Sequence, residues 1–420
     1  MNFLTIIGKP VVAFVQVVLV LIGLQPVKQH RAMLAGGPVN IMLPGLLGYG
    51  EDVGASFAAP YFATLSGTDI ADELEALGYE SYVPSIGPLS SAWDRACELY
   101  AQLTGGRVDY GEAHSALFGH ERYGRGYAEP LFEGWGSRRP VNLIGHSFGG
   151  TTARVFAMLC DEGSAAEREA TPAEDRSPLF DGGLLGGVNA VVTLATPHNG
   201  TTADICVTDE SAETDYLWMA GVFSLMGNSV LISRIYDLQL DHFHMGAPPR
   251  TFGQGRDGWY SLSDALRFLG SRDHALYDLS MDGAAKINEA DQIRPGVRYL
   301  SYSASLTGEA AGYQVPPASA LLNPFLWFYG GQMGLGLGKT SPPGPEWREN
   351  DGAVPLPSAL HPEGQPHREA PARGAVPPGI WNVMPTVYGV DHAYLAGGDP
   401  SRHDTQEILG IYLDMLERIR

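Results

Sequence analysis

The chain has 420 residues, of which 44% are hydrophobic and 18% charged, so it can bury a large core and is not an intrinsically disordered protein. Its 27 basic and 47 acidic residues give a formal net charge of −20, which argues against nucleic acid as a partner because phosphates require a basic face. The three cysteines, Cys97, Cys160 and Cys206, exclude a disulfide framework.

The N-terminal segment differs in composition from the rest of the chain. Residues 3–24 are mostly apolar, and basic residues follow at Lys28 and Arg31. This pattern indicates a signal peptide, although no clean small-residue cleavage site follows, or an uncleaved anchor near the lower length limit for spanning a bilayer. A buried N-terminal helix is the third interpretation. We assign 1–34 to a targeting or anchor segment, expect a secreted or membrane-anchored protein, and place a single enzyme domain at 35–420.

Short apolar runs alternate with segments of helical periodicity along this domain. Strands are predicted at 39–43, 82–83, 141–144, 188–194 and 298–303, and helices at 70–77, 93–103 and 152–160. The alternation predicts an α/β fold with a parallel sheet covered by helices on both faces. The acidic stretch 161–177 is expected to be a solvated surface insertion. The Pro- and Gly-rich stretch 338–379 is expected to be an irregular excursion with a functional role.

A G-x-S-x-G pattern marks the candidate nucleophile. Gly145-His-Ser147-Phe-Gly149 follows the strand at 141–144 and precedes a helix, which is the setting that a nucleophile elbow requires. The glycines have a physical reason, because the turn holds Ser147 in a strained conformation and side chains two residues away would collide with neighbouring backbone. The alternative interpretation is an ordinary glycine-rich turn between a strand and a helix.

A serine nucleophile needs a base and an acid, which follow it in chain order in α/β-hydrolases. Four histidines lie well downstream of Ser147: His361, His367, His392 and His403. His392 is the predicted base because it follows a strand-like run and begins a loop. Asp351, in Glu-Asn-Asp-Gly, is the predicted acid. Asp391 is the alternative acid, but a side chain adjacent to His392 in sequence should point elsewhere.

A second group of chemically suited residues surrounds a glycine. His114 and His120 lie six residues apart, and a turn at Gly119 would bring their imidazoles together. With two carboxylates from elsewhere they would form a closed site that suits zinc. From these residues alone, two surface histidines are the simpler interpretation.

Several long segments of the chain resemble the thermoalkalophilic true lipases of Bacillus-type bacteria and their staphylococcal relatives. The resemblance runs from about Val39 to the C-terminus and is carried by GPLSSAWDRACELYAQLTGGRVDYGEAHSALFGHERYGR, LIGHSFGGTTAR, SPLFDGG, LATPHNGTT, YDLQLD, YDLSMDGAAK, ENDGAV, GIWNVM and VDH. It implies an α/β-hydrolase core with a mostly parallel sheet, a helical lid and a small zinc-binding extra subdomain. The implied partners are a lipid or ester substrate and the lipid–water interface.

Carried over by motif, the resemblance makes Ser147, Asp351 and His392 the catalytic triad, in agreement with the argument from spacing. The implied oxyanion donors are the backbone N–H groups of Leu46 and Phe148. The chain departs from the family at both positions, with Pro-Gly-Leu in place of His-Gly-Phe and with Phe148 in place of Gln or Met. Because an N–H does not depend on the side chain, both donors are expected to remain.

The resemblance also implies metal ligands. The family's zinc ligands correspond to Asp94, His114, His120 and Asp273, and four protein ligands indicate a structural zinc. The implied zinc subdomain covers about 85–125 and 260–280, and the implied lid about 214–249. A calcium site would use Asp399 and Pro400, but Tyr394 replaces the family's Glu. Losing a carboxylate weakens a hard-cation site, so calcium is doubtful.

These observations favour a serine carboxylic ester hydrolase of the triacylglycerol lipase type that acts through an acyl-enzyme. A short-chain esterase or an aliphatic polyester hydrolase of the same fold is the nearer alternative, because chain-length preference cannot be read from these residues. A membrane-anchored binding module without catalysis is a remote alternative, and the complete triad argues against it.

Overall fold

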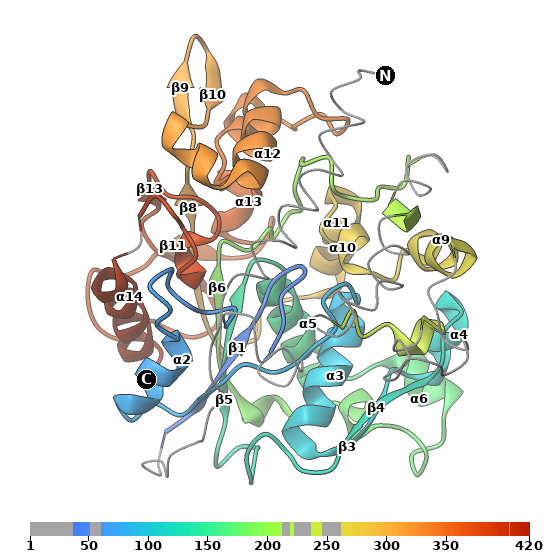
Figure 1. Ribbon diagram of the computed structural model, residues 1–420. Coiled ribbons are helices and arrows are strands. Elements are labelled where there is room, and N and C mark those ends of the chain that lie inside the picture. Colours follow the sequence, from blue (N-terminus) through green and yellow to red (C-terminus); the bar gives the residue numbers. More distant parts are fainter. Residues whose placement is uncertain (1–36, 51–59, 212–218, 222–236, 246–261, 403) are drawn as a thin grey trace, which may run out of the picture.

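A parallel β-sheet forms the centre of the molecule (Figure 1). The computed structural model describes residues 37–50, 60–211, 219–221, 237–245, 262–402 and 404–420. Within them the sheet has seven strands in the order β11-β12-β7-β6-β5-β1-β2, and all neighbours are parallel. The strands are β1 (Val39–Leu43), β2 (Ser81–Tyr82), β5 (Val141–His146), β6 (Val188–Leu194), β7 (Arg298–Tyr302), β11 (His367–Glu369) and β12 (Trp381–Val383). The predicted α/β fold with a parallel sheet is confirmed.

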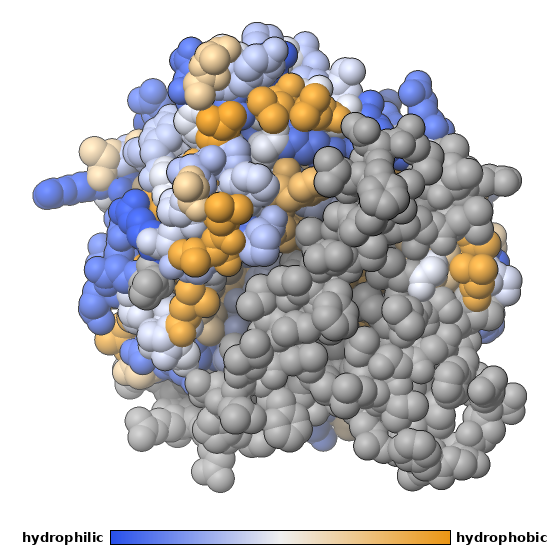
Figure 2. All heavy atoms as spheres, turned by 45° about the horizontal axis from the view of Figure 1, so that its top comes forward, coloured by the Kyte–Doolittle hydropathy of each residue, from blue (hydrophilic) through white to orange (hydrophobic). Residues whose placement is uncertain are grey.

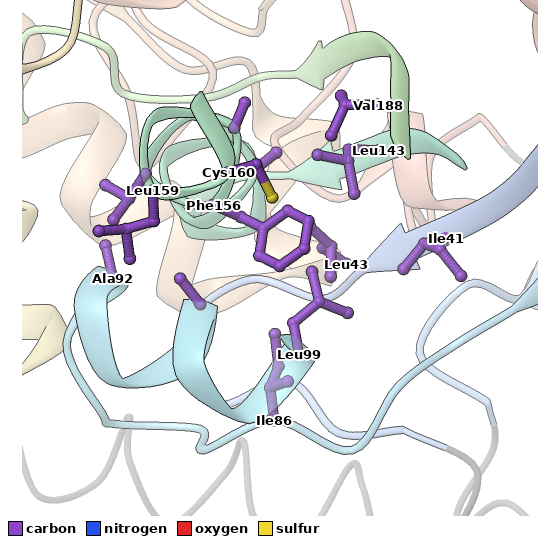
Figure 3. Close-up of a cluster of buried hydrophobic side chains, with 14 of the residues drawn as sticks. Ile41, Leu43, Ile86, Ala92, Leu99, Leu143, Phe156, Leu159, Cys160 and Val188 are labelled. Atoms are coloured by element: carbon purple, nitrogen blue, oxygen red, sulfur yellow. The ribbon is translucent and has the colours of Figure 1, made fainter. Parts of the chain in front are cut away.

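Helices cover both faces of the sheet, because alternate residues of each buried strand point to opposite sides. On one face lie α3 (Ala92–Thr104) and α5 (Phe148–Glu162), and Figure 3 shows Phe156 of α5 among Leu43, Leu99 and Leu143. On the other face, α2 (Ile70–Ala76) and α14 (Thr405–Arg418) bury Met42 of β1. Strand β1 therefore contributes to two separate hydrophobic layers.

A row of polar side chains crosses the sheet near the amino ends of its strands. Asn142 donates through Nδ2 to Asn40 Oδ1 (2.9 Å), and Asn40 donates to Ser81 Oγ (3.3 Å). Asn189 donates to Asn142 Oδ1 (2.7 Å) and accepts from Arg298 Nη1 (3.1 Å). The register of β5 and β6 shifts here, which leaves Asn189 as the extra residue of a β-bulge. The row satisfies polar groups that would be costly if left unpaired inside the sheet.

Smaller elements surround the sheet. They are the hairpin of β3 (Gly106–Asp109) and β4 (Tyr123–Tyr127), the hairpin of β9 (Gly308–Ala310) and β10 (Tyr313–Val315), the parallel pair β8 (Ala304–Ser305) and β13 (Val387–Tyr388), and the helices α4 (Glu112–Phe118), α6 (Ala165–Ala170), α9 (Leu262–Ser271), α10 (Ala275–Asp278), α11 (Met281–Ala290), α12 (Pro324–Leu335) and α13 (Leu356–Leu360). In Figure 1, α12 and the β9–β10 hairpin lie together at one end of the molecule. The three cysteines are free thiols.

The predicted strands and helices agree with the observed ones within two residues, apart from the helix expected at 152–160, which begins at Phe148. The stretch 338–379 is less irregular than expected, because it contains α13 and β11. Strand β11 pairs in parallel with β12 and forms the edge of the main sheet. The prediction of an irregular excursion was therefore wrong in part.

The acidic stretch 161–177 is more than a solvated insertion, so that prediction was also wrong in part. It contains α6, whose Glu167 is buried and accepts from the N–H groups of Ala113 (3.0 Å) and His114 (2.7 Å) at the start of α4. Gly111, at the N-cap of α4, has φ +97°, and a Cβ there would come within 2.3 Å of the Glu167 carboxyl carbon. Glu167 thus supplies the side-chain cap that Gly111 cannot provide.

Two predicted segments lie wholly or largely outside the described residues. The N-terminal segment 1–34 lies outside them, and only 219–221 and 237–245 of the lid range are described. In the described part, Leu240 and Phe243 pack against Phe268 of α9 in a separate hydrophobic cluster. No helix in the described ranges combines the length and apolarity needed to cross a bilayer.

Candidate active site and metal cluster

Ser147 lies in a sharp turn between β5 and α5 and has a strained backbone, with φ 55° and ψ −127°. The flanking glycines allow the close approach that this turn requires. A Cβ at Gly145 would come within 2.3 Å of the Gly149 carbonyl carbon, and a Cβ at Gly149 within 2.1 Å of Leu43 O. The predicted strand, turn and helix are confirmed, together with the predicted reason for the glycines.

Three side chains from distant parts of the chain form one hydrogen-bonded series at this turn. His392 Nε2 lies 2.8 Å from Ser147 Oγ, and His392 Nδ1 lies 2.7 Å from Asp351 Oδ2. Asp351 is fully buried, and its other oxygen accepts from the N–H groups of Ala353 (2.9 Å) and Val354 (2.8 Å). The backbone N–H of His392 also donates to the backbone carbonyl oxygen of Asp351 (2.8 Å), which fixes the two loops to each other. The geometry thus joins the three residues that the sequence selected.

The alternative acid, Asp391, points away from the imidazole. Its Oδ1 accepts from the Ala393 N–H (2.9 Å), and its Oδ2 accepts from Asn323 Nδ2 (3.2 Å). Burial and the nearby Asp399 raise the pKa of Asp391 to about 7. Of the other downstream histidines, His361 and His367 stack on each other, with ring centroids 3.6 Å apart, and His403 lies outside the described residues.

The charge state of His392 follows from its surroundings. Burial lowers the pKa of His392, but the charge of Asp351 and its hydrogen bond raise it, and the net pKa lies above the ordinary value for histidine. An imidazole in this position can accept a proton from Ser147 and can hold it as an imidazolium next to a carboxylate.

A pair of residues that the sequence did not single out holds the backbone of His392. Burial raises the pKa of Tyr61 to about 12 and lowers the pKa of His146 to about 3, so the phenol is protonated and the imidazole neutral. Tyr61 donates to His146 Nδ1 (2.7 Å), and His146 Nε2 donates to His392 O (2.8 Å). Only the fold brings Tyr61 to this site, so sequence reasoning offers no signal for it.

Two backbone N–H groups next to Ser147 have no intramolecular hydrogen-bond partner among the described residues. They belong to Leu46, in the loop after β1, and to Phe148, the first residue of α5. A Cβ placed on Gly45 would come within 2.8 Å of Ser147 Cβ, so the loop after β1 lies directly against the turn that carries Ser147. This arrangement can stabilise negative charge that develops on an oxygen next to Ser147.

A second cluster of polar side chains lies apart from this series. Asp94 of α3, His114 of α4, His120 after Gly119 and Asp273 between α9 and α10 each present one potential ligand atom, all within 4.8 Å of one another. Asp94 Oδ1 and His120 Nε2 are buried and have no hydrogen-bond partner among the described residues, although His114 Nε2 lies 3.3 Å from Asp94 Oδ1. His114 Nε2 also lies 3.1 Å from Asp273 Oδ2. The two atoms without a partner and this pair face a common centre, which is the arrangement that a metal ion requires.

The surroundings of this cluster orient its members. His120 Nδ1 donates to Glu121 O (2.9 Å), which directs the lone pair of Nε2 toward the cluster. Burial raises the pKa of Asp273, but His114 and His120 lower it, and the net pKa lies below the ordinary range for a carboxyl group. His242 lies 3.0 Å from Asp94 Oδ2 through its Nε2, a contact that no spacing in the sequence indicated. The four residues therefore fit a metal ion, as the sequence comparison implied.

The residues around Asp399 do not fit a calcium ion. Asp399 Oδ2 accepts from the Asp391 N–H (2.8 Å), and Oδ1 accepts from the N–H of Ser401 (2.7 Å) and from its hydroxyl (2.6 Å). The guanidinium carbon of Arg402 lies 5.4 Å from the Tyr394 ring centroid, so a positive side chain already occupies this region. Asp399 holds the loop through backbone hydrogen bonds, and no chemical step is assigned to calcium.

Comparison with known proteins adds to this geometry. The sequence model of the family described as "Lipase-like, C-terminal domain" matches residues 37–417. A lipase of Staphylococcus epidermidis is 35% identical over 362 residues, which cover 86% of this chain and 50% of that protein. The chain thus spans about half the length of the curated relatives it matches.

Solved structures show the same likeness over nearly the whole fold. The crystal structure of Staphylococcus hyicus lipase matches with a TM-score of 0.79 and 30% identity, covering 93% of this chain and 98% of that one. The structure of EstA from Clostridium botulinum matches with a TM-score of 0.73 and 32% identity, covering 94% of this chain and 93% of that one.

Proposed function

The chain belongs to the lipase-like family, and from this premise we propose that it is a serine carboxylic ester hydrolase that cleaves triacylglycerols. The hydrogen-bonded series of Ser147, His392 and Asp351 carries the proposal. A serine, a histidine and a buried carboxylate in this order are the groups that form and hydrolyse an acyl-enzyme.

The reaction follows from the positions of these groups. Ser147 Oγ attacks the ester carbonyl while His392 Nε2 takes its proton, and the resulting oxyanion is held by the N–H groups of Leu46 and Phe148. The imidazolium of His392 then protonates the leaving alcohol, which leaves the acyl group on Ser147. Water, activated by the same imidazole, hydrolyses this acyl-enzyme, and Asp351 stabilises the imidazolium in both steps.

The exposed surface favours a substrate that is presented at a lipid–water interface. Figure 2 shows hydrophobic side chains gathered on the face that includes the α12 end of Figure 1. Leu322 (63% exposed) and Leu337 (71% exposed) flank α12 in the sequence, and no residue from 318 to 338 is charged. Helix α12 also flanks the loop of Asp351, because Asn350 Nδ2 donates to Gly330 O (3.2 Å). We assign lid function to about 214–249 as part of the same proposal.

Hydrolysis of a nitrophenyl ester by the purified protein tests the proposal directly. No turnover above the buffer rate would favour the binding module that has lost catalysis. A short-chain esterase would hydrolyse dissolved short esters well and gain nothing when the substrate forms an emulsion. A lipase is expected to gain rate once a tributyrin or longer-chain emulsion appears.

We expect Asp351→Asn to lower kcat/KM by roughly 10³- to 10⁴-fold, whereas Asp391→Asn should change it only a few-fold. His392 acts as a base only when neutral, so kcat/KM falls as the pH drops through its pKa. Because Asp351 raises that pKa, the acid limb of the residual activity of Asp351→Asn should move to lower pH. Profiles of kcat/KM from pH 4 to 10 measure both effects. A larger loss in Asp391→Asn than in Asp351→Asn would overturn the choice of acid.

We propose that the metal cluster binds one zinc ion. Two imidazole nitrogens and two carboxylate oxygens from Asp94, His114, His120 and Asp273 suit zinc, and four protein ligands leave no open position for substrate. The ion would hold α3, α4 and the segment before α10 together in an extra subdomain, formed by about 85–125 and 260–280.

The N-terminal segment remains assigned to targeting or anchoring, and a truncated chain tests this assignment. A chain that starts near Ala35 should be soluble and should retain the kcat/KM and the melting temperature of the full chain. The reason is that the described core begins at Val39 of β1. Insolubility or loss of folding in the shorter chain would show instead that residues 3–24 form part of the core.

A further inference from the structure

The side chain of Arg95 contacts both backbone segments that supply the proposed oxyanion donors. Arg95 lies on α3 and is fully buried. Its Nη1 donates to Gly45 O (3.4 Å), and its Nη2 donates to Pro44 O. Its guanidinium carbon lies 4.8 Å from the centroid of the Phe148 ring. One planar cation thus lies between the loop after β1 and the first turn of α5.

The contact with Gly45 O bears directly on the direction of an oxyanion donor. The carbonyl of Gly45 and the N–H of Leu46 belong to one peptide group, which is planar and trans, so the two bonds point in opposite directions. Donors that anchor the carbonyl therefore set the direction of the N–H, and Arg95 shares this role with the backbone N–H of Gly48, which also donates to Gly45 O (3.0 Å). It also polarises the peptide, which makes the N–H a stronger donor to a negative oxygen.

The contact with Phe148 fixes the second donor in a similar way. The Phe148 side chain is fully buried in the cluster between the sheet and α3. A cation at this distance from the ring is attracted to its face, more strongly when water is excluded. Because the N–H of Phe148 belongs to the same residue, holding the ring restrains the start of α5 beside Ser147.

The turn of α3 that carries Arg95 is itself restrained from the other side. Its neighbour Asp94 points into the metal cluster and is approached by His242 (3.0 Å). Ser91 caps the helix by accepting from the Asp94 N–H (3.1 Å). The guanidinium is therefore held by a rigid helix end, as a residue that orients a catalytic group should be.

We propose that Arg95 is a positioning residue for the oxyanion hole, which aligns the N–H groups of Leu46 and Phe148 without touching the substrate. This inference rests on the proposed ester hydrolase function. A residue in this role affects the transition state, in which the oxygen is charged, more than it affects binding of the neutral ester. Its loss should therefore lower kcat and leave KM nearly unchanged.

The test compares Arg95→Met and Arg95→Lys with the wild type, using a short nitrophenyl ester well below the melting temperature. For Arg95→Met we expect kcat per folded molecule to fall about 10- to 100-fold, with KM changed less than about threefold. Removing one donor entirely costs about 10²- to 10³-fold, so misaligning donors should cost less. Arg95→Lys keeps one charged donor and should recover part of the loss.

A second measurement separates positioning from general loosening of the core. A trifluoromethyl ketone adds to a serine and places a negative oxygen in the hole, whereas the alcohol with the same carbon skeleton does not. Arg95→Met should weaken binding of the ketone by the same factor as kcat and leave binding of the alcohol unchanged.

Arg294→Lys is the matched control, because Arg294 is equally buried but pairs with Asp291 (2.7 Å). It should lower the melting temperature without lowering kcat.

Three results would overturn the inference: a kcat for Arg95→Met within twofold of the wild type, an equal loss of affinity for ketone and alcohol, or an equal loss of kcat in Arg294→Lys. Failure of the proposed function would look different. In that case the wild type itself would not hydrolyse the ester in a Ser147-dependent way and would not bind the ketone more tightly than the alcohol.

Discussion

Replacing Ser147 by Ala is expected to lower ester turnover by about 10⁴- to 10⁶-fold while leaving the protein folded. The hydroxyl is the only nucleophile in the hydrogen-bonded series, and His392 and Asp351 have no group to activate without it. The residual rate would come only from substrate binding and the oxyanion hole. Loss of a single hydrogen bond should change the melting temperature by only a few degrees.

The measurement is kcat/KM for a nitrophenyl ester, with the melting temperature followed by circular dichroism. Ser303→Ala is a suitable control, since Ser303 is also a buried serine but bonds to Thr386 Oγ1 (3.0 Å). It should keep wild-type turnover. Retention of more than about 1% of the activity by Ser147→Ala would refute the assignment of the nucleophile.

Removing the metal should lower the stability of the fold far more than it lowers the rate of ester turnover. Metal binding to a site that the unfolded chain lacks is itself folding free energy. A strong chelator, or His120→Ala, is therefore expected to lower the melting temperature by roughly 10 °C or more. At low temperature, turnover per folded molecule should fall much less than in Ser147→Ala, because four protein ligands would leave no position on the proposed zinc ion open to substrate.

Elemental analysis of protein purified without chelator should find one zinc per chain. His367→Ala serves as the matched variant, since His367 is an exposed histidine of β11 outside the cluster, and its melting temperature should stay at the wild-type value. Protein without zinc would contradict the site. A chelator that abolished turnover at once, with an unchanged melting temperature, would contradict the structural role and indicate a catalytic metal.

The sequence predicted the nucleophile turn because all of its determinants are local. Strand, small residues and helix follow one another around Ser147, and chain order then limits the base and the acid to a few candidates. The predicted base and acid also agree with the geometry, since His392 and Asp351 lie in the same series as Ser147.

Contacts between distant segments were beyond prediction from the residues alone. Asp94 and Asp273 were reached only through the family resemblance, because no local pattern links a helix residue to a carboxylate far along the chain. Arg95 lies within the helix predicted at 93–103, where no role was predicted for it, yet it is buried against the loop after β1. Glu167 belongs to the stretch predicted to be a solvated insertion, yet it caps α4 beside His114 of the proposed metal site.

The row of amides across the sheet has a consequence for how the strands find their alignment. Strands of a parallel sheet are apolar on both faces. If one strand shifts its register by one residue, its apolar side chains exchange faces, and the hydrophobic free energy changes little. Here the same slip would bury Asn40 or Asn142 without its partner and shift one strand by about 3.3 Å along the other. Because β1 leads to Gly45 and β5 leads to Ser147, the slip would also move Gly45 away from Ser147. The amide contacts at the amino ends of the strands thus fix the strand register that places Gly45 beside Ser147 at the carboxyl ends.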